Sequence, residues 1–439
     1  MNKDEILSIL LDWNFWKKDI DIDIGIERKE YIEKALKYMD SNMVICLYGV
    51  RRSGKTFLLR QIAKELIKRN IIDSKDILIV NFEDSRFREY NIDLLDQIFN
   101  IFLQELKPKN PIIFLDEINK INEWERWVRT IHELKKAKIF VSGSSAKLLK
   151  GEISTLLTGR HLDIIVFPFS FEEILYTNKI NTNDKLEILN NLNRIKKILE
   201  EYLKFGGFPE VVLSKDDEIK KKILLQYFDD IIEKDIIFRY NIREIGKIKA
   251  LAKFYLSNIS SLTTFSSLED FLKINKLTIE RFSNYMTESF LIFFVKMYHP
   301  SLKKQEKAPR KVYSIDTGLS NVVGFRLFET KGKLMENLVA IELKKREKEF
   351  YYWKEYGKSE GHEVDFLIKE INIIKELIQV SYINNIDEID NREIRSLIKA
   401  SNLLNCNDLK IITWDLEDKI IKDNKEIKLI PLWKWLLNN

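Results

Sequence analysis

The residues best suited to chemistry stand at positions 49–56, where the chain reads Gly-Val-Arg-Arg-Ser-Gly-Lys-Thr. This stretch matches GxxxxGK[ST] between an apolar, strand-like run and a helical segment. The glycines would let backbone N–H groups curl around phosphates, with Lys55 on the β- and γ-oxygens and Thr56 on Mg²⁺. The pattern therefore predicts a site for ATP and Mg²⁺ formed by Gly49, Val50, Arg51, Arg52, Ser53, Gly54, Lys55, Thr56 and Phe57.

A pair of acids, Asp116 and Glu117, closes a second apolar run at 112–115. Asp116 would complete the magnesium shell, and Glu117 would orient or deprotonate the attacking water. Alone, two acids at a strand end are most simply solvated, but beside a P-loop they favour hydrolysis. A small-molecule kinase is the weakest alternative, because the sequence offers no recognisable site for a substrate hydroxyl.

Ser144 and Arg160 are further candidates for contact with the γ-phosphate. Ser144 follows the strand-like run at 138–142, where a polar side chain can sense the phosphate; a simple Gly/Ser turn is the alternative. Arg160, beside Gly159, could neutralise transition-state charge on a neighbouring subunit of a homo-oligomer. A surface or structural arginine explains it equally well, and the sequence does not decide between action in its own subunit and in a neighbour.

The elements that must position these residues alternate between helix and strand from about 28 to 170. Helices at 28–38 and 55–69 flank an apolar run at 43–48, and further strand-like runs recur at 77–82, 111–116, 137–142 and 162–167. Short apolar strands alternating with helices predict a parallel sheet covered on both faces. The fold class is therefore α/β.

The later part of the chain changes character twice. Residues 171–240 are predicted to be helical, and 245–300 to hold three short helices and then a strand at 291–298, a weak winged-helix pattern. The polar stretch 300–310 is predicted to be a loop. A second α/β pattern then begins, with helices at 331–347 and 391–404 and strands near 350–353, 363–368, 373–380 and 409–414.

Composition sets further limits. With 73 basic and 68 acidic residues, the formal net charge is +5, so any contact with double-stranded DNA must come from a local patch. Cys46 and Cys406 lie far apart, and the four histidines lack metal-ligand spacing, so neither a disulfide framework nor a zinc site is expected. The sequence begins without the apolar stretch of a secretory signal, and its apolar runs are too short to span a bilayer. We expect a cytoplasmic protein with no membrane contact.

Taken together, these residues resemble the AAA+ superfamily, and more narrowly the archaeal and bacterial AAA-type ATPases with a restriction-endonuclease-like C-terminal domain of unknown function. GVRRSGKT and FLDE are generic to P-loop proteins, whereas FPFSFEEIL, GGFPE and YSIDTGL are specific to this family. The matching stretches, which cover nearly the whole chain, are WNFW, YGVRRSGKT, NFED (81–84), FLDEINKINEWE (114–125), SGSSAKLL (142–149), LTGRH, FPFSFEEIL (167–175), YLKFGGFPEVV (202–212), RKVYSIDTGL (310–319) and ENLVAIEL (336–343).

The resemblance implies a P-loop NTPase fold with sheet order 5-1-4-3-2 and ATP at the carboxyl ends of the strands. It also implies ring-like assembly in many relatives, a winged helix and a nuclease-like domain. The expected organisation is an N-terminal segment (1–27), a P-loop AAA+ ATPase domain (28–175), a helical lid (176–240), a winged-helix-like domain (241–325) and a restriction-endonuclease-like, degenerate domain (326–439).

Nucleases of the PD-(D/E)xK type place a helix acid, a strand Asp and a strand E-x-K around Mg²⁺. This chain offers Glu336 and Asp365, but Gln379 and Ser381 stand where E-x-K is expected. Gln379 offers a neutral carbonyl oxygen, and Ser381 cannot replace an ammonium, so a nuclease remnant is favoured over an active nuclease. Arg392 and Glu393 could complete a polar cluster or form surface pairs.

Basic residues between the second and third regions could meet phosphates without catalysis, although a solvated loop is the simpler explanation. They are Lys303, Lys304, Lys307, Arg310 and Lys311.

Three functions remain open. The first is an ATPase whose cycle drives a DNA-directed activity. The second is a nucleotide-dependent switch or interaction protein with slow turnover, and the third is an active metal-dependent DNA nuclease.

Overall fold

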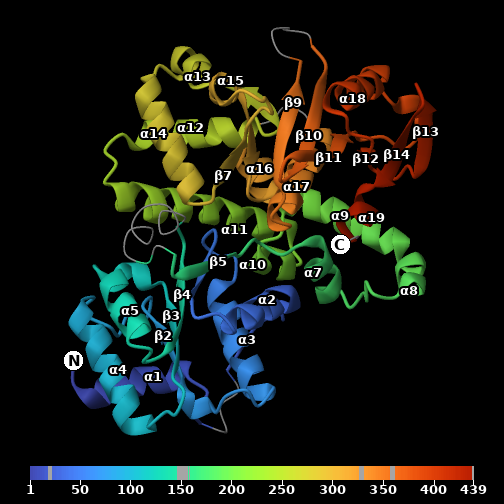
Figure 1. Ribbon diagram of the computed structural model, residues 1–439. Helices are drawn as coiled ribbons and strands as arrows, with labels where there is room; N and C mark the ends of the chain where they lie inside the picture. Colours follow the sequence, from blue (N-terminus) through green and yellow to red (C-terminus); the bar gives the residue numbers. More distant parts are fainter. Residues whose placement is uncertain (18–21, 146–156, 158, 326–330, 356–360, 438–439) are drawn as a thin grey trace. The chain divides into compact units, whose positions relative to one another are not determined.

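The computed structural model describes residues 1–17, 22–145, 157, 159–325, 331–355 and 361–437. The chain divides into two compact units, Met1–Val166 and Phe167–Asn439 (Figure 1). The first unit holds the P-loop, and the second holds both later regions of the sequence.

A five-stranded parallel sheet forms the centre of the first unit. Its order is β2-β3-β4-β1-β5, which read from the other edge is the expected order 5-1-4-3-2. The strands β1 to β3 are wholly buried, as their apolar sequences require in a parallel sheet covered on both faces. The strands are β1 (Val44–Tyr48), β2 (Ile77–Asn81), β3 (Ile112–Asp116), β4 (Lys138–Gly143) and β5 (His161–Ile165).

Helices cover both faces of this sheet (Figure 1). On one side, apolar residues of α2 (Lys29–Met39) and α3 (Lys55–Lys68) form one core cluster with the strands. On the other lie α1 (Lys3–Trp13), α4 (Ile92–Leu106) and α5 (Trp124–Glu133), with short 3-10 turns η1 (Ser74–Asp76) and η2 (Ile118–Lys120) between elements. The predicted P-loop NTPase fold is confirmed.

The WNFW stretch protects the edge of the sheet. The buried side-chain amide of Asn14 donates to Ile79 O (2.8 Å) and accepts from Ile79 N (2.6 Å), and the Trp16 indole donates to Ile77 O (2.7 Å). These bonds satisfy backbone groups of the edge strand β2 that would otherwise be open for pairing. The beginning of the chain is therefore part of the first unit.

The second unit begins with a helical region. It consists of α7 (Phe171–Thr177), α8 (Lys185–Asn190), α9 (Leu192–Phe205), α10 (Pro209–Leu213) and α11 (Asp217–Asp230), and α11 continues into the π-helix η4 (Ile231–Phe238).

A small three-stranded antiparallel sheet of order β6-β8-β7 follows. The element order is α12 (Ile245–Ser257), β6 (Ser261–Thr263), α13 (Phe265–Leu272), α14 (Lys276–Glu288), β7 (Ile292–Val295), α15 (Leu302–Lys307), β8 (Arg310–Ser314) and α16 (Thr317–Val323). The loop predicted at 300–310 is wrong over 302–307, where α15 forms. Gln305 is buried there between exposed neighbours, and one inward-facing polar residue gives no apolar periodicity from which the helix could be predicted.

A separate C-terminal α/β region is present, as expected. Its six-stranded sheet has the order β13-β14-β12-β11-β10-β9, in which β9, β10 and β11 are antiparallel and β12 is parallel to β11. The elements are α17 (Lys331–Lys345), β9 (Glu349–Lys354), β10 (Glu363–Glu370), β11 (Ile373–Val380), η5 (Ile386–Glu388), α18 (Asn391–Leu404), β12 (Leu409–Thr413), β13 (Asp418–Lys422), β14 (Lys425–Pro431) and α19 (Leu432–Leu437).

The three stretches specific to the family meet at one buried junction in the second unit. Asp316 accepts a hydrogen bond from Gly207 N (2.7 Å), and Gly207 O accepts one from Phe169 N (2.7 Å). Gly206 has φ +73°, and a Cβ there would lie 1.9 Å from Asp316 Oδ1. Glycine is therefore required at 206 by the close approach of Asp316, and at 207 by Phe169 O, which would lie 2.2 Å from a Cβ there.

Candidate functional site

The P-loop connects β1 to α3 and needs glycine at both ends. Gly54 caps α3 with φ 92°, in the left-handed region. At Gly49, a Cβ would lie 2.1 Å from Val166 O, because the chain after β5 passes directly against the loop. The two glycines of the motif therefore fix the path of the loop.

Lys55 lies inside this loop with only 5% of its side chain exposed. Its ammonium donates to Gly49 O and Val50 O, both at 3.1 Å, and lies 3.9 Å from Glu117 Oε1. These two backbone carbonyls hold the lysine within the loop. A bound phosphate can take their place as the hydrogen-bond acceptor of the ammonium.

Thr56 and Asp116 meet across the site. The threonine hydroxyl donates to Asp116 Oδ2 at 2.6 Å, and Ser142 from the neighbouring strand β4 donates to Asp116 Oδ1. Burial raises the pKa of Asp116, and its bonds to Ser142 and Thr56 oppose that rise. A hydroxyl and a carboxylate oxygen this close are the donor set that Mg²⁺ takes in P-loop sites, so the residues present fit the ion.

Glu117 stands at the end of β3 in a left-handed conformation, with φ 51°. Its backbone N–H donates to Ser142 Oγ at 3.1 Å. Burial raises the pKa of Glu117 to about 7, and the nearby Lys55 ammonium opposes this. The acid is thus poised beside the loop rather than solvated at the surface.

Three contributors to the site were missed by the sequence reasoning. Ser142 links Asp116 to Glu117, and Glu83 pairs with Arg51 of the loop at 3.0 Å. Arg28, buried to 1% exposure, donates from its guanidinium to Ser53 O at 3.0 Å. Ser142 and Glu83 lie within the stretches SGSSAKLL and NFED, which resemble the family, but neither residue was assigned a function. Arg28 belongs to no motif, so the sequence did not indicate its role.

The remaining predicted positions are placed as follows. Ser144 is fully buried immediately after β4, whose end pairs with Tyr48 at the start of the P-loop. Arg160 pairs with Glu133 of its own chain at 3.1 Å. Residues 146–156 and 158 of the SGSSAKLL and LTGRH stretches lie outside the described residues. Phe57 is partly exposed at the start of α3.

In the second unit, the structure brings the predicted nuclease residues together. The Asp365 N–H donates to Gln379 Oε1 at 3.3 Å, and Asp365 and Glu336 both bind the ammonium of Lys311. Lys311 is therefore not part of a phosphate-contacting loop, and that interpretation is wrong for this residue. Its burial on β8 removes it from solvent.

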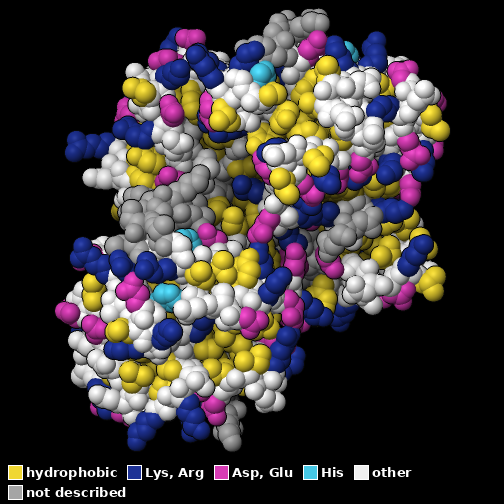
Figure 2. All heavy atoms as spheres, in the orientation of Figure 1, with side chains coloured by type: hydrophobic (Ala, Val, Ile, Leu, Met, Phe, Trp, Pro, Cys, Tyr) yellow, Lys and Arg dark blue, Asp and Glu magenta, His cyan; other side chains and the backbone are white. Residues whose placement is uncertain are grey.

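The other basic residues of that stretch remain at the surface. Lys303, Lys304 and Lys307 are exposed on α15, and Arg310 pairs with Glu306 at 3.2 Å. Figure 2 shows basic and acidic side chains interspersed over the visible face, in keeping with the near-balanced composition.

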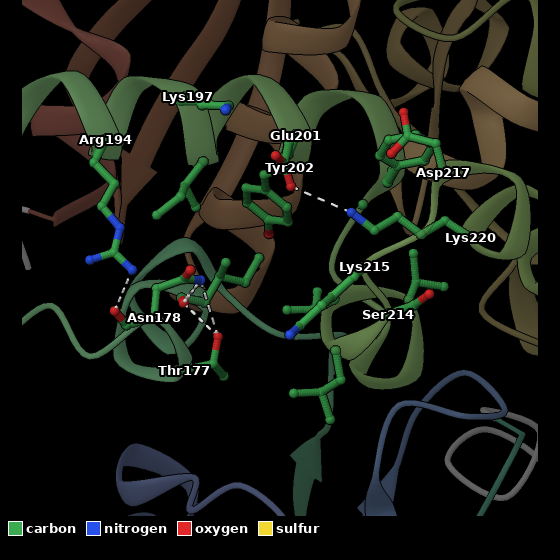
Figure 3. A pocket seen from close by; sticks show the side chains of 17 residues that line it. Thr177, Asn178, Arg194, Lys197, Glu201, Tyr202, Ser214, Lys215, Asp217 and Lys220 are labelled. Carbon is green, nitrogen blue, oxygen red and sulfur yellow. Dashed lines mark hydrogen bonds and ion pairs between the residues drawn. The ribbon is translucent and has the colours of Figure 1, made fainter.

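A cavity of about 530 Å³ lies among α7, α9, α10 and α11 (Figure 3). Lys220 pairs with Glu201 across it at 3.4 Å, and Arg194 donates to Asn178 O at 3.0 Å. No residue of the P-loop lines it, so it is separate from the predicted phosphate site. Within the described part of the chain, no group of three His, Cys, Asp or Glu side chains is arranged to hold a metal ion.

The sheet order, the P-loop and the facing acids define a P-loop NTPase fold of the AAA type. A family profile described as an AAA domain matches residues 41–175. Two profiles described only as domains of unknown function match residues 196–329 and 331–435.

Relatives extend over nearly the whole chain. The uncharacterized protein MJ1544 of Methanocaldococcus jannaschii is 36% identical over 90% of this chain and 88% of its own length. An uncharacterized protein of Haemophilus influenzae is 30% identical over 83% of this chain and 90% of its own length. This protein belongs to the same family as these two uncharacterized relatives.

Solved structures are more distant. The Walker-type ATPase PABY2304 of Pyrococcus abyssi is 15% identical with a TM-score of 0.47, over 70% of this chain and 99% of its own. The Orc1 protein of Aeropyrum pernix, solved in complex with DNA, is 11% identical with a TM-score of 0.31, over 70% and 94% of the two chains. None of the described helices has the length and apolar character of a membrane span.

Proposed function

We propose that this protein is a Mg²⁺-dependent ATPase that couples hydrolysis to a DNA-directed activity. The observation that carries the hydrolytic part is the convergence of Thr56, Asp116, Lys55 and Glu117 around one loop. Residues 49–57 would bind ATP, and Thr56 and Asp116 would hold Mg²⁺, which neutralises phosphate charge when bound.

Each side chain then has a separate task. Lys55 exchanges the carbonyls of Gly49 and Val50 for the β- and γ-phosphate oxygens. Glu117 orients the attacking water and accepts its proton. Ser144, buried at the end of the adjacent strand, senses the γ-phosphate, and Arg160 acts on a neighbouring subunit of a homo-oligomer after releasing Glu133.

The test of hydrolysis separates binding from turnover. Glu117→Gln keeps the size of the side chain and removes the base, so the variant should bind ATP normally and lose roughly 10²–10⁴-fold in turnover. Binding is measured with a fluorescent ATP analogue and turnover by phosphate release. Full turnover by the variant would refute the assigned role of Glu117.

The DNA-directed part rests on the region 241–325, which we propose to be a winged helix. Its order of helix, strand, two helices and an antiparallel pair supports this. On α14, the second helix of the pair, Lys276, Arg281 and Asn284 are exposed and have the donors that contact DNA. The exposed carboxylate of Glu280 on the same helix would repel DNA phosphates, so charge attraction alone does not account for the proposed contact.

One titration tests this coupling against the switch alternative. ATP turnover of the full chain is measured with increasing single- and double-stranded DNA, beside a variant carrying Lys276→Ala and Arg281→Ala. Stimulation by duplex DNA that the double variant loses supports the proposal. A rate unmoved by DNA, together with ATP-dependent assembly, would instead favour a nucleotide-dependent switch.

We also propose that residues 326–439 form a degenerate restriction-endonuclease-like domain. The order α17-β9-β10-β11-α18-β12, with an antiparallel meander followed by a parallel strand, supports this descent. So does the meeting of Glu336, Asp365 and Gln379. The proposed organisation is completed by the 1–27 segment, which belongs to the first compact unit, the ATPase domain at 28–175, whose residues 167–175 belong to the second unit, and the lid at 176–240.

A further inference from the structure

A buried lysine stands at the centre of the acidic cluster in the second unit. The Lys311 ammonium lies 3.0 Å from Glu336 Oε1, 3.0 Å from Glu363 Oε1 and 2.8 Å from Asp365 Oδ1. Only 3% of the lysine side chain is exposed. The three acids come from α17 and β10, whereas the lysine comes from β8 of the small sheet.

The cluster is closed by further hydrogen bonds. The Tyr313 hydroxyl donates to Glu336 Oε1 at 2.7 Å, and Val380 N donates to Asp365 Oδ2 at 3.0 Å. Burial disfavours the charge on Lys311, but Asp365 and Glu336 outweigh it and hold the pKa of the ammonium well above its ordinary range. The lysine is therefore a permanent cation in this site.

The charges explain why a cation must be there. Three acids converge on Lys311. Glu336 and Asp365 are buried, where an unpaired carboxylate is strongly unfavourable. Glu363, by contrast, is partly exposed and also pairs with Lys354 at 3.6 Å. Hard divalent cations also bind clustered carboxylate oxygens, but with Lys311 between them these three acids are not arranged to hold a metal ion. Because the ammonium touches all three acids at hydrogen-bond distance, it leaves no room for such an ion.

We propose that Lys311 is a built-in counter-ion that occupies a latent divalent-cation site formed by Glu336, Glu363 and Asp365. The intact chain then takes no Mg²⁺ or Mn²⁺ there, and the C-terminal region does not cut DNA. Since Lys311 also belongs to β8, the same contact fastens the small sheet to the six-stranded sheet. The inference concerns a site separate from the P-loop and does not depend on ATP hydrolysis.

The experiment measures Mn²⁺ binding to the nucleotide-free full chain. Every protein carries Asp116→Asn, so that the P-loop does not offer a second ion site. Lys311→Ala should bind one Mn²⁺ with at least about tenfold higher affinity than the parent, and Mn²⁺ should raise its melting temperature but not the parent's. Adding Asp365→Asn to Lys311→Ala should abolish both effects.

A second, neutralised variant, in which the central charges of the cluster are removed, keeps the test decisive if Lys311→Ala fails to fold. Lys311→Met with Glu336→Gln and Asp365→Asn removes the central charges together, and it should fold without binding Mn²⁺. If Lys311→Ala folds only when Mn²⁺ is added, the proposal is supported. If it gains no Mn²⁺ binding, or stays unfolded with Mn²⁺ while the neutralised variant folds, the proposal is overturned.

Plasmid nicking supplies an independent check. Metal-dependent nicking by the unsubstituted chain that Asp365→Ala removes would also overturn the proposal, because the site would then already hold an ion beside Lys311.

Discussion

Thr56 donates a 2.6 Å hydrogen bond from its hydroxyl to Asp116, which lies 60 residues further along the chain. The bond joins the start of α3 to the end of β3 and holds two oxygens where an ion beside phosphate requires them.

From this contact we predict that Thr56→Ala lowers ATP turnover on the order of a hundredfold, because one oxygen of the Mg²⁺ shell is lost. Thr56→Ser keeps the hydroxyl and should retain most of the activity. The rates are measured by phosphate release across a Mg²⁺ titration. Equal activity of the Ala and Ser variants would contradict the assigned role of the hydroxyl.

Arg28 stabilises the P-loop through buried contacts. Besides its bond to Ser53 O, its guanidinium lies 4.4 Å from the centre of the Tyr31 ring, and its backbone N–H donates to Gln61. Arg28→Ala should lower the free energy of unfolding by roughly 2–3 kcal/mol and raise the KM for ATP, because Ser53 O loses a charged donor in a buried place.

Arg69→Ala is the matched control for Arg28. This arginine pairs with Glu33 and Glu65 at the surface, where ion pairs contribute little, so its loss should leave the free energy of unfolding nearly unchanged. Denaturant unfolding and ATP titrations of both variants make the comparison, and similar values for the two would count against a positioning role for Arg28.

The junction of the family motifs should be intolerant of a single methyl group. Gly206→Ala would place a Cβ 1.9 Å from Asp316 Oδ1 at φ +73°, and should destabilise the protein by more than about 3 kcal/mol. At Gly246, on α12, a Cβ meets no atom within 4 Å, so Gly246→Ala should leave stability unchanged or slightly raised. Thermal melting distinguishes the two, and equal effects would refute the packing argument.

The carboxyl group of Asp316 should make the free energy of unfolding fall as the pH rises. Burial raises its pKa from the ordinary 3.8 to about 6, against the opposing N–H donors of Gly207, Leu319 and Gly318. Between these two values the folded state binds more protons than the unfolded chain, so this group lowers the free energy of unfolding by on the order of 3 kcal/mol as pH rises from about 4 to 7.

Asp316→Asn isolates this effect. The amide keeps only one acceptor oxygen, so either Gly207 N–H or Leu319 N–H loses its partner, and the variant should be less stable at every pH. Its deficit relative to the parent should narrow from pH 4.5 to pH 7.5, because only the parent loses stability through this carboxyl. Other acids contribute equally to both proteins. A constant deficit, measured by urea unfolding, would show that Asp316 does not titrate in this range.

Local patterns predicted the first unit well. The P-loop and the acid pair are read from consecutive residues, and short buried strands between helices leave few alternatives for the sheet. The strand order came from the family resemblance. The roles of Ser142 and Arg28 were out of reach, because each acts through a contact between elements distant in the sequence.

In the C-terminal region, the sequence did not reveal which lysine joins the acidic cluster. The missing lysine of the acidic cluster was sought near Ser381, yet Lys311 enters from a different sheet, which no local spacing reveals. The hairpin of β13 and β14 did have a signal. Asp423 and Asn424 both have positive φ, as a tight two-residue turn requires, and Asp and Asn are among the non-glycine residues that adopt this conformation most readily.

The most direct measurement is the steady-state ATP turnover of the purified full chain with Lys55→Ala. Lys68→Ala is the control, since Lys68 lies at the far end of the same helix with 71% of its side chain exposed. We predict that Lys55→Ala abolishes turnover while Lys68→Ala matches the parent. Undiminished turnover by folded Lys55→Ala protein would contradict the assignment of the nucleotide site to this loop.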